Sequence, residues 1–158
     1  MTTESKPAPG DFSVTLSFES RLECLWTIRA VLEGILGWVG AQDTQTSLIQ
    51  LAVSEIASNA IEHGYRCQPD HKVDITIKLT GEDLEIVITD DAPPIPEDRL
   101  REISNLQIDD EDPDENWPMR GHGLQIVRKA VDSLAFNRVN NRNLVSLRKH
   151  LILGEQKP

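Results

Sequence analysis

Two pairs of segments with alternating apolar residues constrain the fold of this chain most strongly. In the first pair, 72–79 and 84–90, aliphatic residues recur at every second position, and a short polar connection between the segments favours a hairpin. The second pair, 134–139 and 144–149, is joined by the polar stretch Asn140–Asn143, which predicts another hairpin. The strands of a hairpin run antiparallel, so a mostly antiparallel sheet is expected.

Segments with helical spacing separate these hairpins. The expected elements are a strand at 13–18, helices from about Ser20 to Gly37 and from Thr44 to Gly64, a short helix at 97–106 and a helix at 123–132. Ser20 with Glu23 resembles a capping box at the start of the first helix, and Gly64 fits the left-handed position past the end of the second. Antiparallel strands with helices segregated between them predict an α+β sandwich of two layers.

The length of 158 residues predicts one domain, assigned to residues 12–153. Residues 1–11 and 154–158 are interpreted as disordered tails. Within the domain, about 91–122 is a long stretch rich in Pro, Asp and Glu. A connection this long is usually a functional lid or a disordered segment, so we expect a lid there.

Composition excludes several classes of function. A net charge of −10 without a run of basic residues argues against nucleic acid as a partner. Only Cys24 and Cys67 occur, without a Cys-x-x-Cys pair, which argues against a zinc site and fits a reducing compartment. No apolar run is long enough to span a membrane, and residues 1–11 lack the apolar core of a signal peptide. We therefore expect a cytoplasmic protein without a membrane partner.

The second predicted helix carries the most informative polar residues. At about 100° per residue, Glu55, Asn59, Glu62 and His63 fall in one arc beside the apolar stripe. A carboxylate and an amide one turn apart offer oxygen ligands to a hydrated Mg²⁺. From spacing alone, a solvated polar helix surface is an equally good interpretation.

Two later motifs are weak signals when each is taken alone. Asp90 ends a predicted strand and is followed by the small Ala92, so its carboxylate is placed to accept a hydrogen bond from an amino group; an ordinary turn remains the simpler interpretation. Gly121, His122 and Gly123 precede a predicted helix, where backbone N–H groups bind anions. A flexible joint with an exposed histidine explains that motif equally well.

Taken together, the order and context of these motifs resemble the ATP-binding boxes of the GHKL superfamily. The stretch LAVSEIASNAIEHGY at 51–65 is similar to the anti-sigma-factor serine kinases of the RsbW type, and GHGLQIVRKAVDSL at 121–134 fits the same family. The resemblance covers about 13–149. It implies a Bergerat fold, with a mostly antiparallel sheet covered on one face by about three helices.

The resemblance also implies roles for single residues. Glu55 would be the general base, Asn59 the ligand of the Mg²⁺ that bridges the ATP phosphates, and Asp90 the acceptor for the adenine amino group. It assigns the remaining positions of the three boxes to the ATP site as well: His63, Ala92, Arg120, Gly121, His122, Gly123 and Leu124. The two glycines would let the lid close over the phosphates, and Arg120 would reach the γ-phosphate.

Three positions depart from the superfamily pattern. Ala92 and Pro94 stand where the box after the strand has glycines, and Gln125 stands where many members have a third glycine in the later box. These changes put the affinity for nucleotide in question more than the fold.

The family implies a protein serine kinase that acts on a STAS-domain anti-anti-sigma factor, sequesters a sigma factor and forms homodimers. Trp26, Leu32, Ile35 and Trp38 on the first helix are candidates for the dimer interface or simply core residues. The alternative is a non-catalytic module that uses nucleotide only to set its shape. A histidine kinase and the gyrase type of ATPase are not favoured, because the chain has neither an upstream phosphoacceptor helix nor a following transducer domain.

Overall fold

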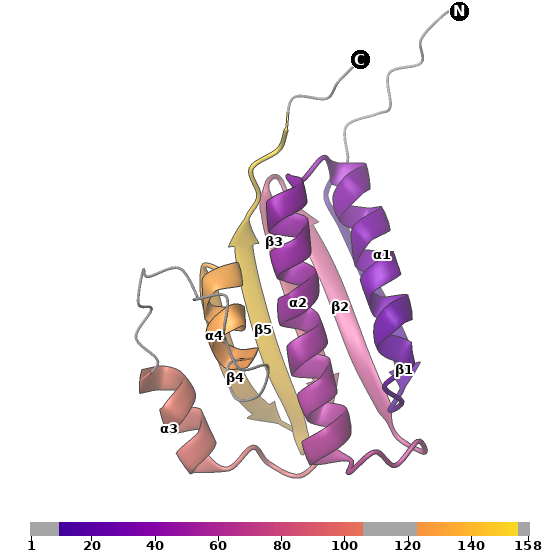
Figure 1. Cartoon of the computed structure of the whole chain (residues 1–158), viewed down its shortest axis with the longest axis vertical. Coiled ribbons are helices and arrows are strands. Elements are labelled where there is room, and N and C mark those ends of the chain that lie inside the picture. The colour runs from indigo at the N-terminus through magenta and orange to yellow at the C-terminus, as the bar shows by residue number, and fades with distance from the viewer. Residues whose placement is uncertain (1–9, 106–122, 155–158) are drawn as a thin grey trace, which may run out of the picture.

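The computed structural model describes residues 10–105 and 123–154, and of residues 102–105 it describes the backbone alone. Within these ranges a single five-stranded sheet has the order β1-β2-β3-β5-β4, and every neighbouring pair is antiparallel (Figure 1). The strands are β1 Phe12–Glu19, β2 Lys72–Thr80, β3 Asp83–Asp90, β4 Ser133–Val139 and β5 Arg142–His150. Most of the predicted tails and the lid residues 106–122 lie outside the described residues.

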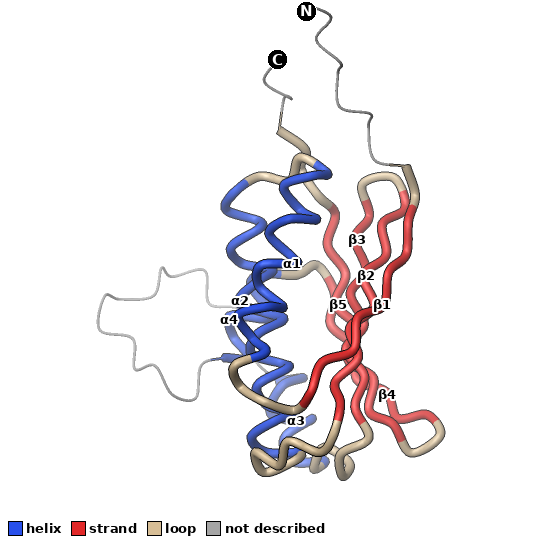
Figure 2. The backbone as a smooth tube through the Cα atoms, turned by 90° about the vertical axis from the view of Figure 1, so that its right-hand side faces the viewer, coloured by secondary structure: helices blue, strands red, loops and turns tan. Residues whose placement is uncertain are grey.

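The helices lie on one face of this sheet, as Figure 2 shows from the side. They are α1 Cys24–Val39, α2 Asp43–Asn59 with its continuation η1 Ala60–Gly64, α3 Glu97–Asn105 and α4 Gly123–Ala130. In Figure 1, α2 runs between α1 and α4, and α3 lies near the lower end of the layer. The predicted α+β two-layer sandwich is therefore confirmed, with α1, α2 and α4 as its helical cover.

The core lies between the two layers. The alternation that predicted the hairpins places one face of each central strand in it, because successive side chains of a strand point to opposite faces. Nine aliphatic residues of β2, β3 and β5 are at most 3% exposed: Val73, Ile75, Ile77, Leu79, Leu84, Ile86, Ile88, Val145 and Leu147. Each such burial stabilises the fold by about 1.5–3 kcal/mol, which fixes the register of the sheet.

The predicted capping box at Ser20 is wrong. Helix α1 begins at Cys24, and Ser20 is 1% exposed before it. The Ser20 hydroxyl donates a hydrogen bond to the Gln68 carbonyl and accepts one from the His71 N–H at 3.2 Å. Ser20 thus ties the end of β1 to the loop before β2, because a buried hydroxyl is stable only with partners of its own.

The predicted role of Gly64 is also wrong. Helix α2 does not end in a left-handed glycine but continues as the π-helical turn η1, and the positive φ angles come later, at Arg66 and Cys67. Glycine is needed at position 64 for space, since a Cβ there would lie 2.7 Å from the Cβ of Ala92. Single π turns of this kind occur often at functional sites.

The second hairpin is tighter than predicted. Strands β4 and β5 are joined by Asn140 and Asn141 alone, with φ angles of 50° and 62°. Two left-handed residues form the type I′ turn that matches the twist of a hairpin, and asparagine tolerates that conformation well. The expected four-residue turn at Asn140–Asn143 is therefore wrong. The observed two-residue turn leaves Asn143 inside β5.

We expect Gly64→Ala to lower the free energy of unfolding by about 1–3 kcal/mol, because the new methyl group overpacks against Ala92. The matched control is Gly37→Ala in α1, where a Cβ meets nothing within 4 Å. That change should raise stability by about 0.5–1 kcal/mol through helix propensity. Urea unfolding measures both, and equal effects of the two substitutions would contradict the close packing at Gly64.

Candidate functional site

The first turn of α4 packs directly on the Glu55 side chain of α2. A Cβ placed on Gly123 would lie 1.9 Å from both Cδ and Oε1 of Glu55, so a side chain there would displace the carboxylate. The structure thus brings together two residues that are 68 positions apart in the sequence (123 − 55 = 68). Glu55 is half-buried in this contact, next to the N–H groups at the start of a helix, which attract anions.

Asn59 lies one turn further along α2. Its amide Nδ2 donates to Oε1 of Glu55 at 3.4 Å, and its side chain is half-buried. The apolar stripe of the same helix, with Ile49, Val53 and Ile56, is buried in the core. Glu55 and Asn59 therefore stand at the margin of the buried face, beside α4, as their spacing predicted.

Asp90 is the last residue of β3 and is buried, with 5% of its surface exposed. Its Oδ1 accepts hydrogen bonds from the Ala92 N–H at 3.0 Å and from Nδ2 of Asn143 at 2.8 Å. Burial raises the pKa of Asp90 above its ordinary value, against the opposing effect of these two donors. Both of these donors use the same oxygen, Oδ1.

Sequence reasoning missed two residues of this network. Asn143 also donates to the carbonyls of Ala92 and Pro93, each at 3.2 Å, and Arg138 donates to Oδ1 of Asn143 at 2.6 Å and to the Ala92 carbonyl at 3.1 Å. They hold the backbone after β3 where the superfamily pattern has glycines. No local sequence signal finds them, because the pairing of Asp90 with Asn143 depends on the register between β3 and β5, which belong to different hairpins.

The two halves of the site meet where α2 and β3 both reach the lower edge of the molecule in Figure 1. Gly64, at the end of η1, packs on the Cβ of Ala92, two residues after Asp90. Because the contact leaves no room for a side chain on Gly64, the end of the helix and the end of the strand are held at a fixed spacing. This joint connects the Glu55–Asn59 pair to Asp90.

The other predicted site residues are placed differently. His63 is exposed, and so is Glu62, because both lie in η1, where π-helical winding replaces the α-helical spacing from which a single arc was predicted. Leu124 is half-buried in the first turn of α4. Arg120, Gly121 and His122 lie outside the described residues.

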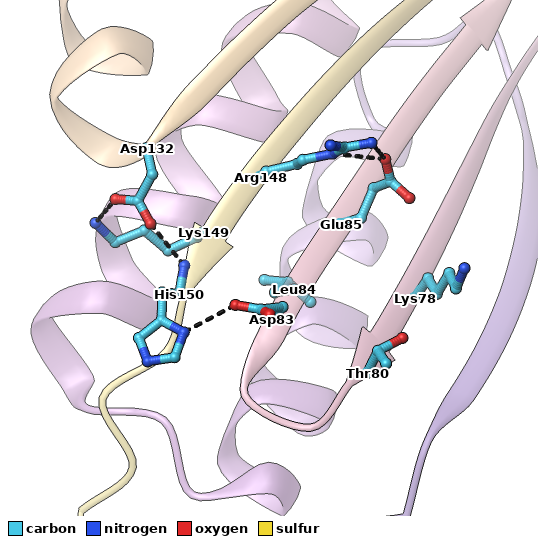
Figure 3. Close-up of a pocket in the computed structure, with 9 residues that line it drawn as sticks. All are labelled: Lys78, Thr80, Asp83, Leu84, Glu85, Asp132, Arg148, Lys149 and His150. Carbon is cyan, nitrogen blue, oxygen red and sulfur yellow. Dashed lines mark hydrogen bonds and ion pairs between the residues drawn. The ribbon is translucent and has the colours of Figure 1, made fainter.

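A separate hollow of about 350 Å³ lies at the opposite end of β3, near Asp83 (Figure 3). Its charged side chains are largely paired with each other. The pairs are Asp132 with Lys149 at 2.7 Å, Glu85 with Arg148 at 2.8 Å and Asp83 with His150 at 2.8 Å. None of the predicted ATP-site residues that the structure describes lines it.

The histidine kinase-like ATPase domain family matches residues 18–149, most of the chain. The chain belongs to this family. Membership implies that the chain binds a nucleotide. No curated protein matches the sequence at a significant level.

Among solved structures, the RsbU and RsbW domains of Rv1364c from Mycobacterium tuberculosis match this ATPase domain with a TM-score of 0.62 at 18% identity. The match covers 92% of this chain and 33% of that one, so the chain spans a third of the longer protein. At this identity the likeness shows the fold. Within residues 10–105 and 123–154, none of the helices is long and apolar enough to cross a bilayer.

Because Asp90 is buried, the free energy of unfolding of Asp90→Asn should rise relative to that of wild type as the pH rises. The raised pKa means that the folded protein keeps this proton to a higher pH than the unfolded chain. Ionisation of Asp90 therefore lowers stability above the ordinary aspartate pKa. The stability of Asp90→Asn relative to wild type should rise between pH 4 and pH 7, as measured by urea unfolding.

Asp132→Asn is the matched control with the opposite sign. The His150 N–H and the Lys149 ammonium lower the pKa of Asp132, so its charge stabilises the fold above the ordinary aspartate pKa and ceases to do so as pH falls through the lowered value. This variant should lose stability at pH 7, and the loss should diminish in acid. Parallel pH profiles for the two variants would contradict the burial of Asp90.

Proposed function

We propose that this ATPase domain is a protein serine/threonine kinase of the anti-sigma type. It transfers the γ-phosphate of Mg-ATP to a serine or threonine of a STAS-domain anti-anti-sigma factor and sequesters a sigma factor in a partner switch. The observation that carries the proposal is the Glu55 carboxylate, half-buried against Gly123 and one turn from Asn59. A carboxylate placed at the phosphate end of a nucleotide site suits transfer to a hydroxyl better than binding alone.

The residues present suit a hydrated magnesium ion. Asn59 uses Nδ2 toward Glu55, so its Oδ1 would be the atom that holds the metal. Oxygen ligands from one or two side chains, completed by phosphates and water, are the set that Mg²⁺ prefers. When bound, the ion would bridge phosphate oxygens and offset their charge.

In the proposed reaction Glu55 acts as the general base. Its carboxylate accepts the proton of the acceptor hydroxyl, whose oxygen forms a bond to the γ-phosphorus. The bond from that phosphorus to the oxygen bridging it to the β-phosphate breaks, and ADP leaves with the electron pair. General-base help of this kind typically contributes about 10²–10⁴-fold to the rate.

Asp90 is proposed to select adenine. Asn143 and the Ala92 N–H occupy Oδ1 and orient the carboxylate, which leaves Oδ2 to accept a hydrogen bond from the adenine amino group. The family resemblance adds Leu124, Arg120 and the other residues of the glycine box on the phosphate side. A site built to hydrogen-bond an amino group rejects analogues that lack it, because its buried acceptor would be left unpaired.

A homodimer through α1 is part of the proposal, with one correction to the interface. Leu32 is 1% exposed and belongs to the core, and Ile35 is half-buried. Trp26 is 75% exposed and Trp38 is 38% exposed, although Trp38 also packs on Phe12. The proposed dimer surface on α1 therefore centres on Trp26. A cytoplasmic location, without nucleic acid or membrane as partner, completes the proposal.

One observation favours the second candidate function, a non-catalytic switch that binds nucleotide to set its shape. Ala92 is 2% exposed and packed on Gly64, and Asn143 and Arg138 tie the backbone that follows β3. A loop fixed in this way favours a long-lived nucleotide complex over rapid release of the nucleotide. Phosphate transfer to the partner separates the two functions.

We expect Glu55→Gln to lower phosphate transfer to the cognate STAS-domain protein by about 10²–10⁴-fold while Mg-ATP binding survives, because only the proton acceptor is lost. Transfer is measured with labelled ATP and binding by calorimetry. Glu33→Gln, which removes an exposed carboxylate of α1, is the control and should behave as wild type. If wild type binds both ATP and the partner but transfers nothing, the kinase proposal fails and the switch remains.

A further inference from the structure

Tyr65, the single tyrosine of the chain, links the helix that carries Glu55 and Asn59 to the strand that carries Asp90. It follows η1 directly, is 4% exposed, and donates its backbone N–H to the Ala60 carbonyl at 2.8 Å. The π turn therefore fixes where the ring enters the fold.

The Tyr65 hydroxyl occupies the place of a missing bond between β2 and β3. The last paired residues there are Val73 and Asp90, so Lys72 and Asp91 would form the next pair. The hydroxyl accepts a hydrogen bond from the Asp91 N–H at 2.9 Å and lies 3.0 Å from the Lys72 carbonyl. A side chain just past the helix that carries Asn59 thus completes the sheet beside Asp90.

A second contact fixes the orientation of this hydroxyl. It donates to Oδ1 of Asp91 at 2.5 Å, and the His71 ring stacks on the tyrosine ring with centroids 4.3 Å apart and planes 10° from parallel. Burial, with a smaller effect of the Asp91 hydrogen bond, raises the pKa of Tyr65 above its ordinary value. The hydroxyl therefore stays protonated at neutral pH and remains a donor.

We propose that Tyr65 is a positioning residue for recognition of the nucleotide base: it holds the Asp90–Asp91 peptide at a set distance from the helix that bears Glu55 and Asn59. This inference rests on the proposed role of Asp90 in binding adenine. Without the hydroxyl, the Asp91 N–H loses its partner, and among the described residues only the packing of Gly64 on Ala92 still joins η1 to the end of β3. Asp90 then meets the base poorly, whereas the phosphate end of the site, on α2 and α4, is unchanged.

The test compares calorimetric affinities for Mg-ATP and for the Mg complex of purine riboside triphosphate, which has the same phosphates but no 6-amino group. Wild type should prefer ATP. Tyr65→Phe should bind ATP about tenfold more weakly and the analogue within about twofold of wild type. A purely structural tyrosine would weaken both ligands equally or neither, and either result overturns the proposal.

Two controls separate this proposal from the one on which it rests. Ser17→Ala removes the 2.6 Å hydrogen bond to Asp74, away from the site, and should change neither affinity. In Asp90→Asn, adding Tyr65→Phe should have no further effect on ATP affinity, because the contact that it positions is already gone. If wild type itself does not prefer ATP, the role of Asp90 fails; if wild type does and Tyr65→Phe keeps the full preference, only the role of Tyr65 fails.

A second measurement uses the protein without mutation, so it does not depend on whether Tyr65→Phe folds. With ¹³C-labelled tyrosine, the single ring gives one set of NMR signals. These should shift on adding Mg-ATP and remain in place on adding Mg-tripolyphosphate, which lacks a base. Equal shifts with both ligands, or none with ATP, would contradict a link between Tyr65 and the base end of the site.

Discussion

The structure depends on one close contact, in which the backbone of Gly123 lies against the carboxylate of Glu55. A side chain at position 123 would push the Glu55 carboxylate out of this position. The contact keeps a carboxylate at the margin of the core and beside the start of a helix, where backbone N–H groups attract phosphate. Glu55 is half-buried there and accepts a hydrogen bond from Asn59, and its proposed role as general base rests on this placement.

The second half of the site depends on the end of the sheet. Asp90 is buried, with its donors on one oxygen, and the backbone that follows is held by Asn143 and Arg138 from the neighbouring hairpin. Gly64 and Tyr65 join this half to the helix. The site is thus assembled from both layers of the sandwich, and its geometry follows from how the end of α2 meets the end of β3.

Local patterns in the sequence predict the layers, the strands of both hairpins and the placing of Glu55 and Asn59 at the margin of a buried helix face. They fail where a distant residue decides the outcome. The Ser20 hydroxyl bonds Gln68 and His71 instead of capping a helix, and Ala92 leaves no space for a side chain on Gly64. The parts played by Asn143 and Arg138 follow from strand pairing, which a local pattern does not contain.

The central claim is that the metal and phosphates of ATP lie between α2 and α4, and paramagnetic broadening tests it directly. Mn²⁺ added in trace amounts to the ATP complex should broaden the amide NMR signals of Asn59 and Gly123. The signals of Lys78 and His150, beside the hollow at the other end of the sheet, should broaden much less, because paramagnetic broadening falls steeply with distance. Broadening near Lys78 and His150 with sharp signals at Asn59 and Gly123 would contradict the account.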